Sequence, residues 1–226
     1  MIPIHIKTET FSEPDVALYY LVAAEGVYLV KKTGLYRSVT RADWIVGPQS
    51  QAPALELNLP KVPRAHMERV YGFFDAVYQN CQGEAIVFLF YDPDRGDFQI
   101  GVPRQTVRRY WYAGGWITEG HVEYDQMARP EGYLKIGDIH SHGKQSAFFS
   151  AVDDHDDQED GLRIVIGRLD LEPPDVCASF VAAGYRFPKN GDDVAEPFTA
   201  RISPPHEWLA RVRVCDAPRY VSWTPP

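Results

Sequence analysis

Two histidines and an aspartate in one short segment have the types and spacing of a zinc site. His140 and His142 are two residues apart, and on a strand such residues project to the same face. Asp153 follows eleven residues after His142, behind a loop long enough to return to the metal. Zinc in hydrolases takes three such ligands at about 2.0–2.2 Å and leaves one position for water. The segment therefore predicts a zinc site formed by His140, His142 and Asp153.

The third ligand is expected in the first turn of a short helix. Ser150 stands three residues before Asp153, in the Ser-x-x-Asp pattern that begins many helices. More acidic residues follow directly, so a shift of one residue would make Asp154 the ligand instead. His155 as a fourth ligand would need an awkward helix turn, which favours an open, catalytic position over a closed structural site.

The elements that must position these residues are a helix and a series of strands. Pro63 suits the first turn of a helix, and apolar residues then recur at helical intervals up to residue 78, which predicts about four turns. The nearly unbroken apolar run 84–91 predicts a strand buried on both faces. Further strands are expected at 98–102, 116–124, 133–142, 162–167 and 176–185. This order predicts an α+β domain around a mixed or antiparallel sheet.

The segment resembles the motif of the JAMM/MPN+ (JAB domain) zinc metalloproteases, a superfamily with a cytidine-deaminase-like mixed sheet flanked by helices. In that motif His-x-His is followed by seven residues, then Ser, two residues and Asp. Residues 143–149 are those seven, Ser150 follows, and Asp153 completes the pattern. The resemblance implies Zn²⁺ as cofactor and a role for Ser150 in holding the oxyanion formed during attack.

The resemblance also implies an upstream glutamate that acts as general base. Glu84 occupies its place, at the start of an apolar strand after a helix and Gly83. The alternative is that Glu84 is a solvent-facing residue at a strand start, with Glu119, Glu123 and Glu131 as weaker substitutes. The sequence departs from the family at Gly143, where a proline usually follows the second histidine. Asp138 shares the strand face of His140 and either orients the imidazole of a histidine ligand or has a surface role.

Two stretches extend the resemblance to a narrower bacterial group, the PRTRC system protein A group. They are residues 21–30 and 138–143. Its members are encoded beside an E1-like ThiF-related protein and a small ubiquitin-like protein. The resemblance therefore implies an isopeptidase or peptidase that acts on the tail of a ubiquitin-like protein, with the ThiF-related protein as a further partner. Two alternatives remain open: a non-catalytic MPN-type scaffold, and a zinc hydrolase of small-molecule amide or sulfur adducts.

Composition excludes several other classes. The net charge is −8, from 31 acidic against 23 basic residues without a long Lys/Arg run, so no nucleic-acid partner is expected. Cys81, Cys177 and Cys215 have no CxxC spacing, which argues against a disulfide framework. No export signal or long apolar stretch is present, so we expect a cytoplasmic protein without a membrane partner.

The chain is expected to have three parts. Short β-rich runs between residues 17 and 39 and a proline-rich stretch at 47–60 predict a β-rich N-terminal extension and linker over residues 1–60. Residues 61–187 are the predicted catalytic domain, and 188–226 a C-terminal extension that packs on it. Either extension is a candidate homodimer surface.

Overall fold

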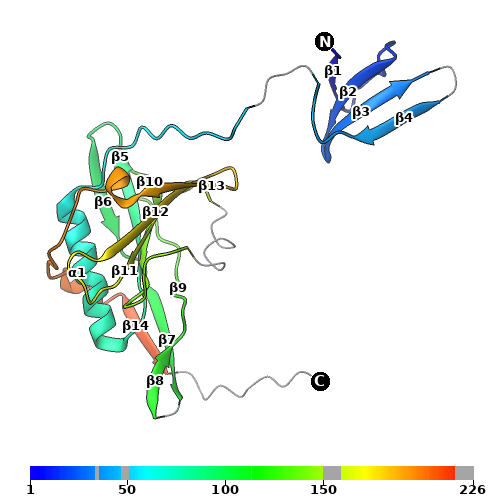
Figure 1. The fold of residues 1–226 in the computed structure, drawn as a ribbon. Coiled ribbons are helices and arrows are strands. Elements are labelled where there is room, and N and C mark those ends of the chain that lie inside the picture. Colours follow the sequence, from blue (N-terminus) through cyan, green and yellow to red (C-terminus); the bar gives the residue numbers. More distant parts are fainter. Residues whose placement is uncertain (34–35, 47–50, 113, 150–158, 217–226) are drawn as a thin grey trace. The chain divides into compact units, whose positions relative to one another are not determined.

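The computed structural model describes residues 1–33, 36–46, 51–112, 114–149 and 159–216, and it divides into two compact units, Met1–Ala54 and Leu55–Pro226 (Figure 1). The first unit is a four-stranded sheet in the order β1-β2-β3-β4. Its strands are β1 (Ile4–Ile6), β2 (Leu18–Ala23), β3 (Gly26–Lys32) and β4 (Arg37–Arg41). Tyr19, Leu21 and Val30 form its own small core, as expected for a β-rich unit.

The long helix of the second unit is α1 (Arg64–Cys81), which begins directly after Pro63. Its apolar residues are buried at the predicted helical spacing, and Phe73 and Phe74 are fully covered. The helix ends at Gln82, whose left-handed backbone lets its N–H donate to the Tyr78 carbonyl at 2.7 Å. Among the helices of the described residues, none is long and apolar enough to cross a membrane.

A six-stranded mixed sheet packs against α1 in the order β13-β12-β11-β10-β5-β6. β10 pairs in parallel with β11, and the other neighbours in this sheet are antiparallel. The bounds are β5 (Ile86–Asp92), β6 (Asp97–Gly101), β10 (Leu134–Ser141), β11 (Gly161–Gly167), β12 (Asp175–Ala182) and β13 (Tyr185–Asn190). The predicted α+β class with a mixed sheet is therefore confirmed, with α1 as the one long helix of the described residues.

The expected strand at 176–185 is instead a hairpin. Ala183 and Gly184 adopt positive φ angles of 50° and 76° and turn the chain between β12 and β13. The expected strand at 116–124 is likewise two short strands, β8 (Gly115–Thr118) and β9 (Glu123–Tyr124). In both places a short turn divides the stretch expected as one strand: Ala183 and Gly184 in the first, and residues 119–122 in the second.

A second, smaller sheet in this unit was not expected from the sequence. It has the order β14-β7-β8, with β9 also paired to β7. β7 (Gln105–Tyr112) and β14 (Val212–Asp216) are parallel although they lie far apart in the chain. The inner face of this sheet packs on the main core through Val107, Val212 and Val214.

Residues 188–216 of the expected C-terminal extension are integrated into the second unit. The short helices α3 (Gly191–Val194) and α4 (His206–Leu209) precede β14. The Trp208 ring packs edge-on against Phe73 of α1, with ring centroids 5.7 Å apart. The boundary predicted after residue 187 falls inside β13. Cys81, Cys177 and Cys215 are all free, and burial raises the pKa of the Cys81 thiol.

The contact between α1 and the C-terminal segment is tight at Gly72, and this gives a first prediction. A Cβ at position 72 would lie 1.9 Å from the Ile202 carbonyl oxygen, so Gly72→Ala must push that backbone off the helix. We expect a loss of about 1–3 kcal/mol in the free energy of unfolding. Urea unfolding measures it, with Gly120→Ala as control because a Cβ there meets nothing within 4 Å. Equal midpoints for the two variants would refute this packing.

Candidate active site

The two predicted histidine ligands lie at the end of β10, in the middle of the main sheet. Alternation along the strand puts Asp138 and His140 on the face away from α1, while Ile139 is fully buried in the core on the other face. His142 follows directly after the strand, and its N–H donates to the Ile166 carbonyl of β11 at 3.0 Å. The backbone of both neighbouring strands therefore fixes where the two imidazoles stand.

The two imidazole rings lie side by side. Their centroids are 5.2 Å apart with an interplanar angle of 43°. The His142 residue is 8% exposed and the His140 side chain 16% exposed, so both rings are largely withdrawn from solvent. Phe148 packs edge-on against His142 with a centroid distance of 4.7 Å and covers one side of the pair.

Glu84 stands two residues before β5, the strand that pairs with β10. His140 pairs with Ile86 of β5, and the Ser141 N–H donates to the Ala85 carbonyl at 3.0 Å. Continuing this antiparallel register by one residue puts Glu84 opposite His142, and two residues before Ile86 it shares that residue's face. The register thus puts Glu84, His140 and His142 at one edge of the sheet, the edge where β5 begins and β10 ends.

Two buried polar residues that the sequence analysis missed hold the start of β5 in place. The Ser141 hydroxyl accepts the Ala85 N–H at 3.1 Å. The Gln105 side-chain amide forms a pair of hydrogen bonds with Ile86, accepting its N–H at 2.9 Å and donating to its carbonyl at 3.0 Å. Neither residue has a sequence signal, because each acts on a strand far away in the chain.

The loop after His142 is held by backbone hydrogen bonds. Gln145 N–H donates to the His142 carbonyl at 3.0 Å, and Leu169 N–H donates to the Gly143 carbonyl at 2.9 Å. Gly143 has φ of +57°, and a Cβ there would lie 2.6 Å from the Tyr78 ring of α1. Proline, whose φ is fixed near −65°, does not fit this conformation. Where the family motif usually has proline, Gly143 therefore gives the loop a different backbone path, which these hydrogen bonds hold in place.

Asp138 is part of a buried ion pair beside His140. Its carboxylate lies 3.4 Å from the Arg163 Nε on β11, and the two side chains are 14% and 6% exposed. The same carboxylate lies 4.0 Å from His140 Nδ1, which is ion-pair range but longer than a hydrogen bond. Arg163 also donates to the Glu159 carbonyl at 2.8 Å. The burial of Asp138 beside His140 favours a role in orienting this imidazole over a surface role.

Other predicted residues are placed differently or not described. Ser150 and Asp153 lie outside the described residues, as do the alternatives Asp154 and His155. Among the residues that are described, no three His, Cys, Asp or Glu side chains form a metal-binding group. Glu123 is bound by Arg108 through two hydrogen bonds of 2.7 and 3.0 Å, which lower the pKa of its carboxyl and make it a poor proton acceptor.

Comparison with known proteins identifies this part of the chain. Residues 80–183 match the family described as prokaryotic homologs of the JAB domain. This region belongs to the JAB superfamily. The match includes Glu84, both histidines and the segment with Ser150 and Asp153, so the superfamily expected from the motif is confirmed. JAB domains include zinc metallopeptidases and also non-catalytic members. The search of curated proteins gave no match.

The tight fit at Gly143 gives a second prediction for this JAB domain. Gly143→Ala must place a side chain in a left-handed conformation, which costs about 1–2 kcal/mol, and also displace the Tyr78 ring, which costs about 1–3 kcal/mol more. Gly96→Ala is the matched control, because its φ is +66° and nothing lies within 4 Å of its Cβ. Chemical unfolding of both variants separates backbone strain from the clash. Equal losses would mean that Tyr78 does not press on this loop.

Proposed function

We propose that this JAB domain is a zinc-dependent isopeptidase or peptidase with His140, His142 and Asp153 as metal ligands. The observation that carries the proposal is the paired, largely buried imidazoles of His140 and His142. Zn–N bonds of about 2.0–2.1 Å place two imidazoles on one tetrahedral ion with centroids about 5 Å apart. The 5.2 Å separation in this chain fits that value. The Asp153 carboxylate would complete the three-ligand set typical of hydrolytic zinc sites.

Zinc in such a site supplies a Lewis acid that makes a water molecule nucleophilic near neutral pH. Glu84 would take the proton from that water and pass it to the leaving amine. Its place at the same sheet edge as the histidines supports this role, and Gln105 and Ser141 hold the backbone that carries it. The Ser150 hydroxyl would donate to the oxyanion formed at the scissile carbonyl. These roles need no residue outside this domain.

The substrate we propose is the C-terminal tail or isopeptide linkage of a ubiquitin-like protein. The support is the resemblance of residues 21–30 and 138–143 to the PRTRC system protein A group, together with the JAB match. An E1-like ThiF-related protein is the proposed further partner, and the setting is a bacterial cytoplasm. The finer fold proposed for the domain is the cytidine-deaminase-like arrangement of JAMM/MPN proteins.

Metal content and cleavage together test the proposed roles, which is the third prediction. Purified wild type should bind about one zinc per chain and cleave ubiquitin-like proteins with extended C-termini. His140→Ala should lose zinc and activity. Glu84→Gln should keep zinc and lose activity by at least about a hundredfold, as expected when a general base is removed. Elemental analysis and a gel-based cleavage assay are the two measurements, and a chelator should abolish cleavage by wild type.

Two exposed positions serve as matched controls. His206→Ala on α4 and Glu25→Gln in the first unit make the same chemical changes at exposed residues outside β5 and β10, and both should behave as wild type. Wild type without zinc would contradict the proposed catalysis and support a non-catalytic MPN-type scaffold. Zinc binding without cleavage of any ubiquitin-like protein would favour small-molecule amide or sulfur adducts as substrates.

The buried carboxylate beside His140 gives the fourth prediction. Asp138→Asn should weaken zinc binding by about tenfold or more, because a carboxylate near a metal-bound imidazole orients the ring and raises its basicity. Competition with a fluorescent zinc chelator measures this affinity without an activity assay. Asp97→Asn is the control, since Asp97 pairs with the Tyr133 hydroxyl at 2.8 Å and lies away from the histidines on β6. Unchanged zinc affinity in Asp138→Asn would limit Asp138 to its ion pair with Arg163.

A further inference from the structure

The small sheet of the second unit has an outer face rich in arginine. Alternation divides each strand between two faces, and Val212 and Val214 of β14 pack on the core while Arg211 and Arg213 are exposed. On β7, Val107 is buried and Arg104, just before the strand, is exposed. The inner face is thus fixed by apolar packing, and the arginines are left on the outer face.

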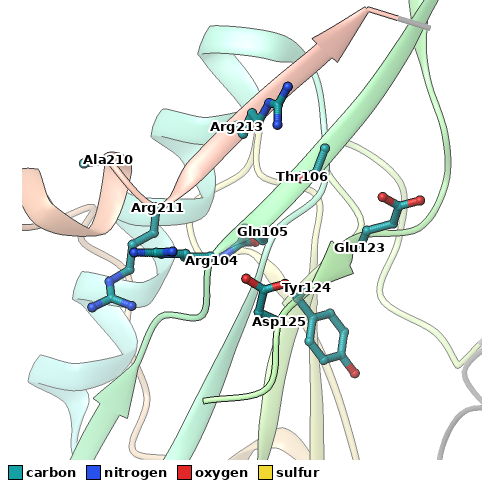
Figure 2. Close-up of a pocket in the computed structure, with 9 residues that line it drawn as sticks. All are labelled: Arg104, Gln105, Thr106, Glu123, Tyr124, Asp125, Ala210, Arg211 and Arg213. Atoms are coloured by element: carbon teal, nitrogen blue, oxygen red, sulfur yellow. The ribbon is translucent and has the colours of Figure 1, made fainter. Parts of the chain in front are cut away.

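Strand pairing arranges these arginines in two rows across the sheet. Arg213 pairs with Thr106, which pairs with Glu123 of β9. One row earlier, Arg211 and Asp125 flank Arg104: the Arg211 carbonyl accepts the Gln105 N–H, and the Arg104 carbonyl accepts the Asp125 N–H, both at 2.9 Å. The six side chains surround a groove of about 630 Å³. Figure 2 shows them around this groove, with Arg213 pointing away from Arg104 and Arg211.

The groove carries an excess of positive charge. Glu123 is already bound by Arg108, and Asp216 by Arg109 at 2.6 Å. Within the described part of the chain, no carboxylate forms an ion pair with Arg104, Arg211 or Arg213. Asp125 alone offsets part of their charge. The three arginines therefore leave the groove with more positive than negative charge, in a chain whose net charge is −8.

We infer that this groove binds an extended acidic segment of a partner protein, with carboxylates at alternate positions. Arg213 lies on β14 and Arg211 directly precedes the strand, so their Cα atoms are at most about 6.6–7.2 Å apart. Alternate side chains of an extended peptide repeat at the same distance. Guanidinium groups also bind carboxylates with two parallel hydrogen bonds. The inference is independent of the proposed hydrolase activity.

The arrangement disfavours other anions. A single phosphate is best held by guanidinium groups that converge on one point, whereas Arg213 points away from Arg104 and Arg211 (Figure 2). A nucleic acid carries its charge on a long, regular backbone and would extend from the groove over a surface that is acidic overall. A short acidic segment matches the charge of the groove.

Fluorescence anisotropy with the full chain tests the inference. The probe is a labelled peptide of alternating aspartate and threonine, and its counterpart has asparagine in place of aspartate. We expect the aspartate peptide to bind, the asparagine peptide not to bind, and added salt to weaken binding. The double variant Arg211→Gln/Arg213→Gln should lose about tenfold in affinity, because two exposed charge pairs with the same peptide are removed.

Arg69→Gln is the matched control, because Arg69 is exposed on α1, away from the outer face of the small sheet, and the change removes the same charge. It should bind the aspartate peptide as wild type does. Equal weakening by Arg69→Gln would mean diffuse charge attraction and would overturn the inference. So would tighter binding of inorganic phosphate or of a single-stranded oligonucleotide than of the peptide, or equal binding of a peptide with the same aspartates in one block. Circular dichroism confirms that the variants, all at exposed positions, remain folded.

Discussion

A one-residue bulge in β10 decides on which face of the main sheet the histidines lie. Lys135 pairs with Phe90 and Gly137 with Leu89, so Ile136 is an extra residue between two rungs of the ladder. After this point Asp138 faces with Phe88 and His140 with Ile86. Without the extra residue, every later side chain of β10 would turn to the opposite face, toward α1. The position of the histidines that the proposed chemistry needs depends on this irregularity.

Gly137 makes the bulge possible. A Cβ at this position would lie 1.8 Å from the Leu162 carbonyl oxygen of β11, so the two parallel strands approach each other too closely for any side chain. The close approach also sets Asp138 directly beside Arg163, its register partner. A buried ion pair is costly unless both charges are satisfied, and Arg163 has the Glu159 carbonyl as a second acceptor. The bulge, the glycine and the ion pair therefore act as one unit that positions His140.

The sequence predicted the elements in which the spacing of apolar residues reflects packing on one buried surface. α1 and strands β5, β10 and β11 were expected because their residues face a single continuous core. β7 was not expected, since its arginines and aromatic residues show no simple alternation of apolar and polar types. β14 was missed because its role depends on pairing with a strand about a hundred residues earlier. The spacing of His140 and His142 predicted one site, to which the resemblance to the JAMM motif added Glu84, and in the structure Glu84 directly precedes the part of the chain that pairs with the end of β10. The contributions of Gln105 and Arg163 arise only from contacts between distant strands.

Gln105 links the two sheets of the second unit close to Glu84, the proposed general base. Its side chain satisfies both backbone groups of Ile86, two residues after Glu84, while its own N–H donates to the Arg211 carbonyl ahead of β14. Gln105 is 2% exposed, so water does not easily replace these bonds. A side chain unable to form them would leave buried polar groups unsatisfied, at about 1–3 kcal/mol each. The arginine-rich sheet is therefore part of the support that fixes the strand of Glu84, whatever partner its outer face binds.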